Sequence, residues 1–119
     1  MTTSTLSLAK AAANAMLEKK ATEVTILKLG TLTSVCDYFV IANANSRVQA
    51  KALAQAVKDK FKQYKIYSRN QHGLEFGNWI LMDFANIIVH IFLPEVREFY
   101  DLEGFWSKAK RIPFEQDEE

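Results

Sequence analysis

Two short apolar runs separated by a two-residue break stand out in the second half of the chain. The first run covers residues 79–84 and the second covers 87–93, with only Ala85 and Asn86 between them. Short apolar runs joined by two residues are typical of a β-hairpin. We therefore predict two antiparallel strands that turn at Ala85 and Asn86.

The predicted hairpin has two unlike faces, because side chains alternate along each strand. On the wholly apolar face the opposed pairs are Phe84 with Ile87, Met82 with Val89, and Ile80 with Ile91. On the mixed face Trp79, Leu81 and Asp83 oppose Phe92, His90 and Ile88. We interpret the apolar face as core and the mixed face as the one that a function must explain.

Apolar spacing predicts the other elements in the same way. We expect helices within 1–20, at 46–64, at 95–100 and at 101–109, and strands at 23–29 and 37–42, with a loop at 68–78 that could include a short strand. Ser46 followed by Gln49 is typical of a capping box at the start of the long helix. Its inward stripe should comprise Ala50, Leu53, Val57, Phe61 and Tyr64.

The order of these elements predicts the fold class. Strands on both sides of a long helix favour an α/β fold in which helices pack on a single mixed sheet. We expect one domain over residues 1–119, with a flexible acidic tail at 113–119.

Composition places the chain among globular proteins. Hydrophobic residues make up 49% and charged residues 24% of the 119 positions, and the net charge is +1. The single cysteine excludes an intrachain disulfide. No apolar run approaches the ~20 residues of a membrane-spanning helix. We therefore expect a soluble, cytoplasmic protein without membrane contact.

Charge is unevenly distributed along the chain. Residues 47–69 hold seven basic side chains against Asp59 alone, whereas residues 95–119 hold eight acids against four basic side chains. The basic face of the 46–64 helix has two possible interpretations: it contacts RNA, or it is an ordinary lysine-rich face that only meets solvent. The acidic end also carries aromatics at 99–106, and aromatics beside charges are typical of protein-binding hot spots. The same aromatics could equally anchor short helices on the sheet.

Candidate catalytic residues are few. Cys36 beside Asp37 could be a thiol nucleophile with a histidine base, but a buried thiol at a strand start is the favoured reading. His90 could be a general base, although a histidine between apolar neighbours more often belongs to a core or a contact surface. The two histidines and the cysteine lack zinc-site spacing, and the glycines form no phosphate-binding loop. We expect no enzyme activity, no cofactor and no metal.

Several motifs, in order, resemble those of one known family. They are the strand 37–42, Ser46-x-x-Gln49, Trp79-x-Leu81-x-Asp83, Val89-His90-x-Phe92, and the run 97–103 followed by Trp106. Over residues 6–110 the chain resembles the ribosomal silencing factor family, also called Iojap-like.

Two positions depart from the family pattern. His72-Gly73 stands where the family often has Glu-Gly, and Phe84-Ala85-Asn86 stands where it often has Tyr-Gly-Asp. A turn that needs a positive φ is less comfortable without glycine, and Asn86 should tolerate it better than Ala85.

The resemblance implies a fold like that of nucleotidyltransferases without their catalytic carboxylates. It also implies binding to the large ribosomal subunit on its protein L-fourteen. There the factor would block joining of the small subunit and lower translation when nutrients are scarce. The resemblance further implies that related organellar members act in ribosome assembly.

We expect the partner-binding residues to lie on the mixed hairpin face and in the acidic-aromatic segment. They are Trp79, Leu81, Asp83, His90, Arg97, Tyr100, Asp101, Leu102 and Glu103. Trp79 and Leu102 would be apolar anchors. Asp83, Asp101 and Glu103 would pair with basic groups of the partner, and His90 and Arg97 would orient these acids.

Other hypotheses stay open. The protein could act in ribosome assembly, or be a nucleotide-using transferase with a site around Ser34, Asp37, Asp83 and His90. Ribosomal RNA could meet the basic helix through Lys51, Lys58 and Lys62. Free chains could also form a homodimer through an apolar patch.

Overall fold

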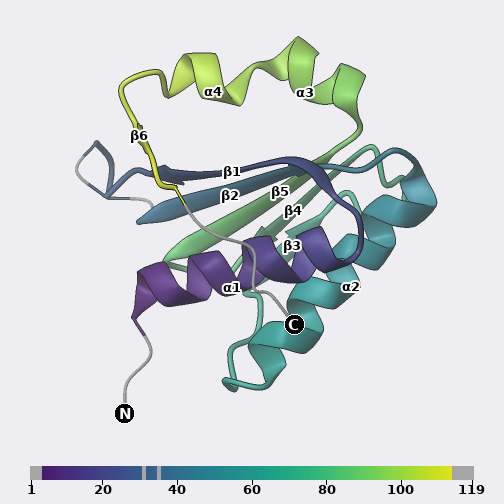
Figure 1. The fold of residues 1–119 in the computed structure, drawn as a ribbon, viewed down its shortest axis with the longest axis horizontal. Coiled ribbons are helices and arrows are strands. Elements are labelled where there is room, and N and C mark those ends of the chain that lie inside the picture. Colours follow the sequence, from purple (N-terminus) through teal and green to yellow (C-terminus); the bar gives the residue numbers. More distant parts are fainter. Residues whose placement is uncertain (1–3, 31, 35, 114–119) are drawn as a thin grey trace.

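A six-stranded sheet with helices on both faces forms the centre of the computed structural model (Figure 1). The structure describes residues 4–30, 32–34 and 36–113, so the expected tail lies outside it apart from Pro113. The helices are α1 (Thr5–Glu18), α2 (Arg47–Lys62), α3 (Pro94–Tyr100) and α4 (Leu102–Phe105). The strands are β1 (Thr22–Lys28), β2 (Tyr38–Asn43), β3 (Asn70–His72), β4 (Trp79–Asp83), β5 (Ile87–Phe92) and β6 (Lys110–Arg111). The predicted α/β fold with one mixed sheet is confirmed.

The strands lie in the order β3-β4-β5-β2-β1-β6. Only β2 and β5 run parallel, and all other neighbours are antiparallel. The predicted hairpin register is confirmed, because Ile80 pairs with Ile91 and Leu81 pairs with His90. A hydrogen bond of 2.9 Å from the Phe84 amide to the Ile87 carbonyl closes the hairpin.

Two apolar clusters hold the layers together. The larger lies between the sheet and helices α1 and α2, and it includes the apolar hairpin face, for example Met82 and Val89. The smaller lies on the opposite face, where Leu27, Phe39 and Phe92 are covered by the segment after β5. Figure 1 shows α1 and α2 on one side of the sheet and α3 and α4 on the other.

Local signals explain how α2 begins. The Ser46 hydroxyl accepts a hydrogen bond from the Gln49 amide at 3.0 Å, as predicted. The Gln49 side chain in turn accepts from the amide of Asn45 at 2.6 Å, one residue earlier than in the standard capping box. Both contacts satisfy backbone donors at the helix start.

The prediction of which α2 residues face the core is confirmed except for the last one. Four of these residues are fully buried: Ala50, Leu53, Val57 and Phe61. The prediction for Tyr64 is wrong, since this side chain is 42% exposed. The helix ends at Lys62, and Ile66 packs against the core instead, with its amide bonded to the Phe61 carbonyl at 3.0 Å.

The segment after β5 forms a strap across the second face of the sheet. We define this strap as residues 94–111, which comprise α3, α4 and β6. The helix predicted at 101–109 is wrong in extent, because α4 ends at Phe105 and the chain then pairs with β1. In the described part of the chain, no helix is long and apolar enough to cross a membrane.

The hairpin turn places Ala85 in a conformation that favours glycine. Ala85 has φ 75°, so the expectation that Asn86 would take the positive φ is wrong. The Asn86 amide donates to the Phe84 carbonyl at 3.0 Å and closes a three-residue turn around Ala85. The Ala85 amide is meanwhile held by a carboxylate oxygen of Asp83 at 2.7 Å, so the turn is fixed despite its strain.

Ala85→Gly should raise the free energy of unfolding by about 1 kcal/mol, because glycine removes the strain of a positive φ. Urea denaturation would measure the change. Ala52→Gly, on the exposed side of α2, is the matched control and should lower stability by about 1 kcal/mol. A loss of stability in both variants would contradict the assigned turn.

Candidate functional site

An aromatic cluster joins the strap to the mixed face of the hairpin. The Trp79 ring lies 4.9 Å from that of Phe92 and 4.6 Å from that of Tyr100, measured between centroids. The indole N–H of Trp79 donates to Nδ1 of His90 at 3.2 Å. Two residues of β5, Phe92 and His90, therefore hold Trp79 in place, and Tyr100 of α3 also packs against it.

The outer surface of the strap is aromatic and acidic. Phe99, Tyr100 and Phe105 are 81%, 51% and 78% exposed. Exposed carboxylates lie beside them at Glu95, Glu98 and Asp101. We define these six residues together with Trp79 as the strap surface. Exposed aromatics among charges are typical of protein-binding sites, and the acids would favour a basic partner.

Arg97 ties the strap to the edge of the sheet. Its side chain is only 11% exposed and its Nε donates to Glu103 at 2.9 Å. The guanidinium also donates to the Glu23 carbonyl at 2.6 Å, to Asn43 Oδ1 at 3.0 Å and to Thr25 Oγ1 at 3.2 Å. This set of contacts gives a largely covered cation the hydrogen-bond partners that it needs.

An irregularity in β1 helps to build this contact. The register of β1 against β2 shifts between Thr22 and Thr25, and Glu23 has φ 51°. A β-bulge of this kind bends the strand and redirects its groups. The Glu23 carbonyl therefore belongs to an irregular stretch of the strand and is available to Arg97.

Glu103 is the centre of a three-residue ion network. Arg111 contacts its second oxygen at 3.1 Å. The hydrogen bond from Arg97 lowers the pKa of Glu103 below its usual value; burial opposes this effect, and the charges of both arginines add to it. Glu103 is therefore ionised at neutral pH, with its charge matched inside the molecule.

His90 is part of the core. It is 3% exposed, and burial lowers its pKa to about 4, so its imidazole is neutral at physiological pH. Phe39 contacts it edge-on at 4.5 Å. The expected orientation of an acid by His90 does not occur at Asp83, which instead pairs with Arg69 at 3.1 Å.

The thiol and the transferase alternatives gain no geometric support. Cys36 is 4% exposed, and burial together with the charges of Asp37 and Asp83 raises its pKa to about 11. A thiol of this kind is not a nucleophile at neutral pH. Of the transferase candidates, Ser34 is exposed in a loop and His90 is bonded to Trp79. Within the described residues, no group of three or more His, Cys, Asp and Glu side chains could hold a metal ion.

The nine residues expected to bind a partner thus fall into three groups. Trp79, Leu81 and Tyr100 are accessible on the mixed face or the strap. Arg97 and Glu103 form the internal network. The other four make internal contacts: His90 packs on Phe39, Leu102 packs against the smaller apolar cluster, Asp83 pairs with Arg69, and Asp101, which is also exposed on the strap surface, accepts from the Gly104 amide and caps α4.

Sequence reasoning did not select Phe99 and Phe105 as site residues, although they are the most exposed aromatics of the strap. Their neighbours Tyr100 and Trp106 contact them edge-on at 5.1 and 5.2 Å. Two adjacent aromatic residues within a short predicted helix, as at 99–100 and 105–106, would have been the sequence signal for an exposed ring. In each pair only one ring can face the sheet, and the other must face solvent.

Comparisons with known proteins agree on one family. The model of the family "Ribosomal silencing factor during starvation" matches residues 2–119. A ribosomal silencing factor from Zymomonas mobilis is 37% identical over 100 residues, which cover 84% of this chain and 75% of that protein. A mouse protein named for mitochondrial assembly of the ribosomal large subunit is 27% identical and is matched over 76% of this chain and 41% of its own length.

Solved structures point the same way. A crystal structure of a protein from Chromobacterium violaceum superposes with a TM-score of 0.86 at 30% identity, and the match covers 97% of this chain and 95% of that one. The family model spans nearly the whole chain, including β4, β5 and the strap. The chain therefore belongs to the ribosomal silencing factor family.

Proposed function

We propose that this protein binds the large ribosomal subunit through its protein L-fourteen and prevents the small subunit from joining. It would thereby repress translation when nutrients are limiting. The observation that carries the proposal is the strap surface, where three exposed aromatics lie among carboxylates on a segment fixed to the sheet. Ribosomal proteins are basic, so this surface is complementary to them in charge.

The energetic centre of such an interface would be Trp79 with Tyr100. The Trp79 ring is held against Phe92 and His90, and Tyr100 contacts it with a tilted ring while remaining half exposed. A rigid, partly exposed aromatic pair loses little conformational entropy on binding, which is the usual property of a hot spot. The exposed carboxylates around it would steer association.

Tyr100→Ala should weaken binding to purified large subunits about tenfold or more, as expected for loss of a hot-spot aromatic. Cosedimentation at several protein concentrations would measure it. Tyr64→Ala is the matched control, because Tyr64 is 42% exposed at the end of α2, away from the strap. Wild-type binding by Tyr100→Ala, in a protein with an unchanged melting temperature, would contradict the assigned surface.

The block of subunit joining has its own test. Large subunits saturated with the protein should sediment separately when small subunits are added, whereas free large subunits should form joined ribosomes. Tyr100→Ala should restore joining if the strap surface docks, because it removes an exposed aromatic of that surface. Joined ribosomes that still carry the wild-type protein would refute a steric block.

A role in assembly of the large subunit is the second candidate, and the name of the mouse relative favours it. Gradient profiles of cells that lack the protein would distinguish the two. An assembly factor predicts incomplete large-subunit precursors, and a silencing factor predicts mature large subunits that join too readily under starvation.

Contact with ribosomal RNA through the basic helix would be separate from protein docking. Helix α2 lies on the opposite face of the sheet from the strap (Figure 1). Lys51 and Lys62 are exposed there, and Lys58 is partly buried. Such a contact would therefore be peripheral to the interface made by the strap surface.

A further inference from the structure

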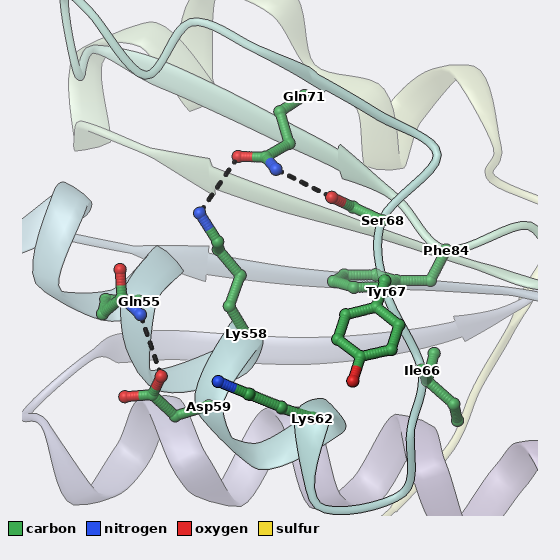
Figure 2. A pocket seen from close by; sticks show the side chains of 9 residues that line it. All are labelled: Gln55, Lys58, Asp59, Lys62, Ile66, Tyr67, Ser68, Gln71 and Phe84. Carbon is green, nitrogen blue, oxygen red and sulfur yellow. Dashed lines mark hydrogen bonds between the residues drawn. The ribbon is translucent and has the colours of Figure 1, made fainter.

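A pocket of about 340 Å³ lies on the α2 side of the molecule, away from the strap (Figure 2). One wall is a single face of α2, formed by Gln55, Lys58, Asp59 and Lys62. The opposite wall is the segment from Ile66 to Ser68 together with Gln71 of β3, and Phe84 also lines the pocket. Its volume is at the lower end of the ~300–1,000 Å³ range of small-molecule sites.

The polar groups of the pocket form an ordered arrangement. Lys58 extends from α2 to Gln71, with its Nζ 3.4 Å from the amide oxygen, and the Gln71 amide donates to Ser68 Oγ at 2.8 Å. Figure 2 shows this chain of contacts across one end of the pocket. The amides and the hydroxyl can both donate and accept, as recognition of a heteroaromatic edge requires.

Charge in the pocket favours an anion. Lys58 and Lys62 are its two cations, and Asp59 is its one carboxylate. The Asp59 carboxylate already accepts a hydrogen bond from Gln55 at 2.8 Å. The Lys58 ammonium points toward Gln71 and the Lys62 ammonium lies toward Asp59 (Figure 2), so a phosphate between them would form a charge-assisted hydrogen bond with at least one of the two lysines.

The apolar groups of the pocket favour a flat ring. Tyr67 is 64% exposed at its rim. Phe84 is buried, and an edge-on contact with Phe61, at 4.7 Å between ring centroids, holds it in place. An aromatic side chain at the rim of a positively charged groove is the usual platform on which a nucleobase stacks.

We propose that this pocket binds a nucleoside phosphate, with the phosphate on Lys58 and Lys62 and the base on Tyr67. The nucleotide would be either free or an unpaired residue of an RNA. The proposal does not depend on docking of the strap, because the pocket is lined by α2, which lies on the opposite side of the sheet from α3 and α4 (Figure 1).

Titration followed by NMR would test this proposal on the full chain. The probes are the four ribonucleoside 5′-monophosphates, a single-stranded oligoribonucleotide and inorganic phosphate. We expect saturable shifts at the amides of Ser68 and Gln71. Tyr67→Ala should weaken binding about tenfold, in keeping with the value of one base–aromatic stack.

Lys58→Gln combined with Lys62→Gln should weaken binding at least as much. Lys51→Gln combined with Lys60→Gln makes the same charge change on the same helix outside the pocket, and it should leave affinity nearly unchanged. Tyr67 and the pocket lysines are not core residues, so these variants should stay folded.

The outcomes separate the two sources of ligand. Binding of mononucleotides indicates a free nucleotide, and binding of the oligoribonucleotide alone, with the same dependence on the variants, indicates RNA. Three results would overturn the proposal: no saturable shift with any nucleotide, equal binding of inorganic phosphate, or equal losses in the pocket and control variants. None of them bears on subunit binding by the strap surface.

Discussion

Arg97→Met should lower the free energy of unfolding by about 3 kcal/mol, as expected when a partly buried ion pair is broken and the three further hydrogen bonds of its cation are lost. Methionine keeps the apolar stem of the side chain but leaves three acceptors without their donor: Asn43, Thr25 and the Glu23 carbonyl. Glu103 would keep only its contact with Arg111. Urea denaturation followed by tryptophan fluorescence would measure the loss, since Trp79 and Trp106 both pack against the smaller apolar cluster, which the strap covers.

Arg111→Met is the matched control for this prediction. Arg111 contacts the same carboxylate at 3.1 Å, but its side chain is 62% exposed. Its removal should cost less than about 1 kcal/mol, as for other surface ion pairs. Equal losses in the two variants would mean that the network acts only through net charge, and that Arg97 does not anchor the strap.

Acidification from pH 6.5 to 4 should destabilise the protein by about 3 kcal/mol through His90 alone, at up to ~1.4 kcal/mol per pH unit. Burial lowers the pKa of His90 from 6.5 to about 4. Between these values the unfolded chain binds a proton that the folded chain does not, so stability falls as the pH falls. The stabilising contribution is fully present above pH 6.5 and is lost once the pH has reached the folded-state pKa.

His90→Phe should remove this pH dependence and cost stability at neutral pH, because the Trp79 N–H loses its acceptor. His72→Gln, at an exposed position on β3, is the control and should leave the wild-type slope unchanged. Glu103 contributes in a lower range, because its pKa is lowered and its stabilising effect is lost only below the ordinary carboxylate pKa. Parallel wild-type and His90→Phe stability curves over pH 4–6.5 would contradict the prediction.

The sequence was sufficient for the hairpin, because a two-residue connection fixes the pairing of its strands. Once Ala85 and Asn86 are the central pair, each opposed pair from Trp79–Phe92 to Asp83–Ile88 follows by counting. The contact between Trp79 and His90 follows in the same way, since the two are diagonal neighbours. The conformation of the turn did not follow, because the hydrogen bond that the Ala85 amide donates to the Asp83 carboxylate overrides the preference of asparagine for positive φ.

The sequence analysis expected Arg97 to orient acids, and it does contact Glu103, but its contacts with the sheet could not have been predicted from local pattern. Its partners on the sheet are separated from it by 54, 72 and 74 residues along the chain. An arginine between acids looks like a surface residue until the fold places it against a bulge in β1. The same limitation explains Tyr64 and the short α4, which depend on where neighbouring elements leave space.

The sequence pattern also did not predict which residues of the strap are exposed and which make internal contacts. Asp101 and Glu103 are two positions apart, yet Asp101 is exposed and Glu103 is bonded to two arginines. Spacing on helices as short as α3 and α4 does not define a face, because each has only one or two turns. Only the three-dimensional structure separates candidate contact residues from those that position the strap.

The attachment of the strap at both ends has a consequence for folding and opening. Its stabilising contacts join distant parts of the chain and can form only after β1 and β2 have paired, so they raise the contact order and form late. A short segment held by one ion network, a two-residue strand and a few partly buried apolar side chains is also the kind of element that opens by local unfolding at less than the global free energy. A partner that binds only the closed strap would then stabilise the whole protein, and subunit binding and folding stability would be thermodynamically linked.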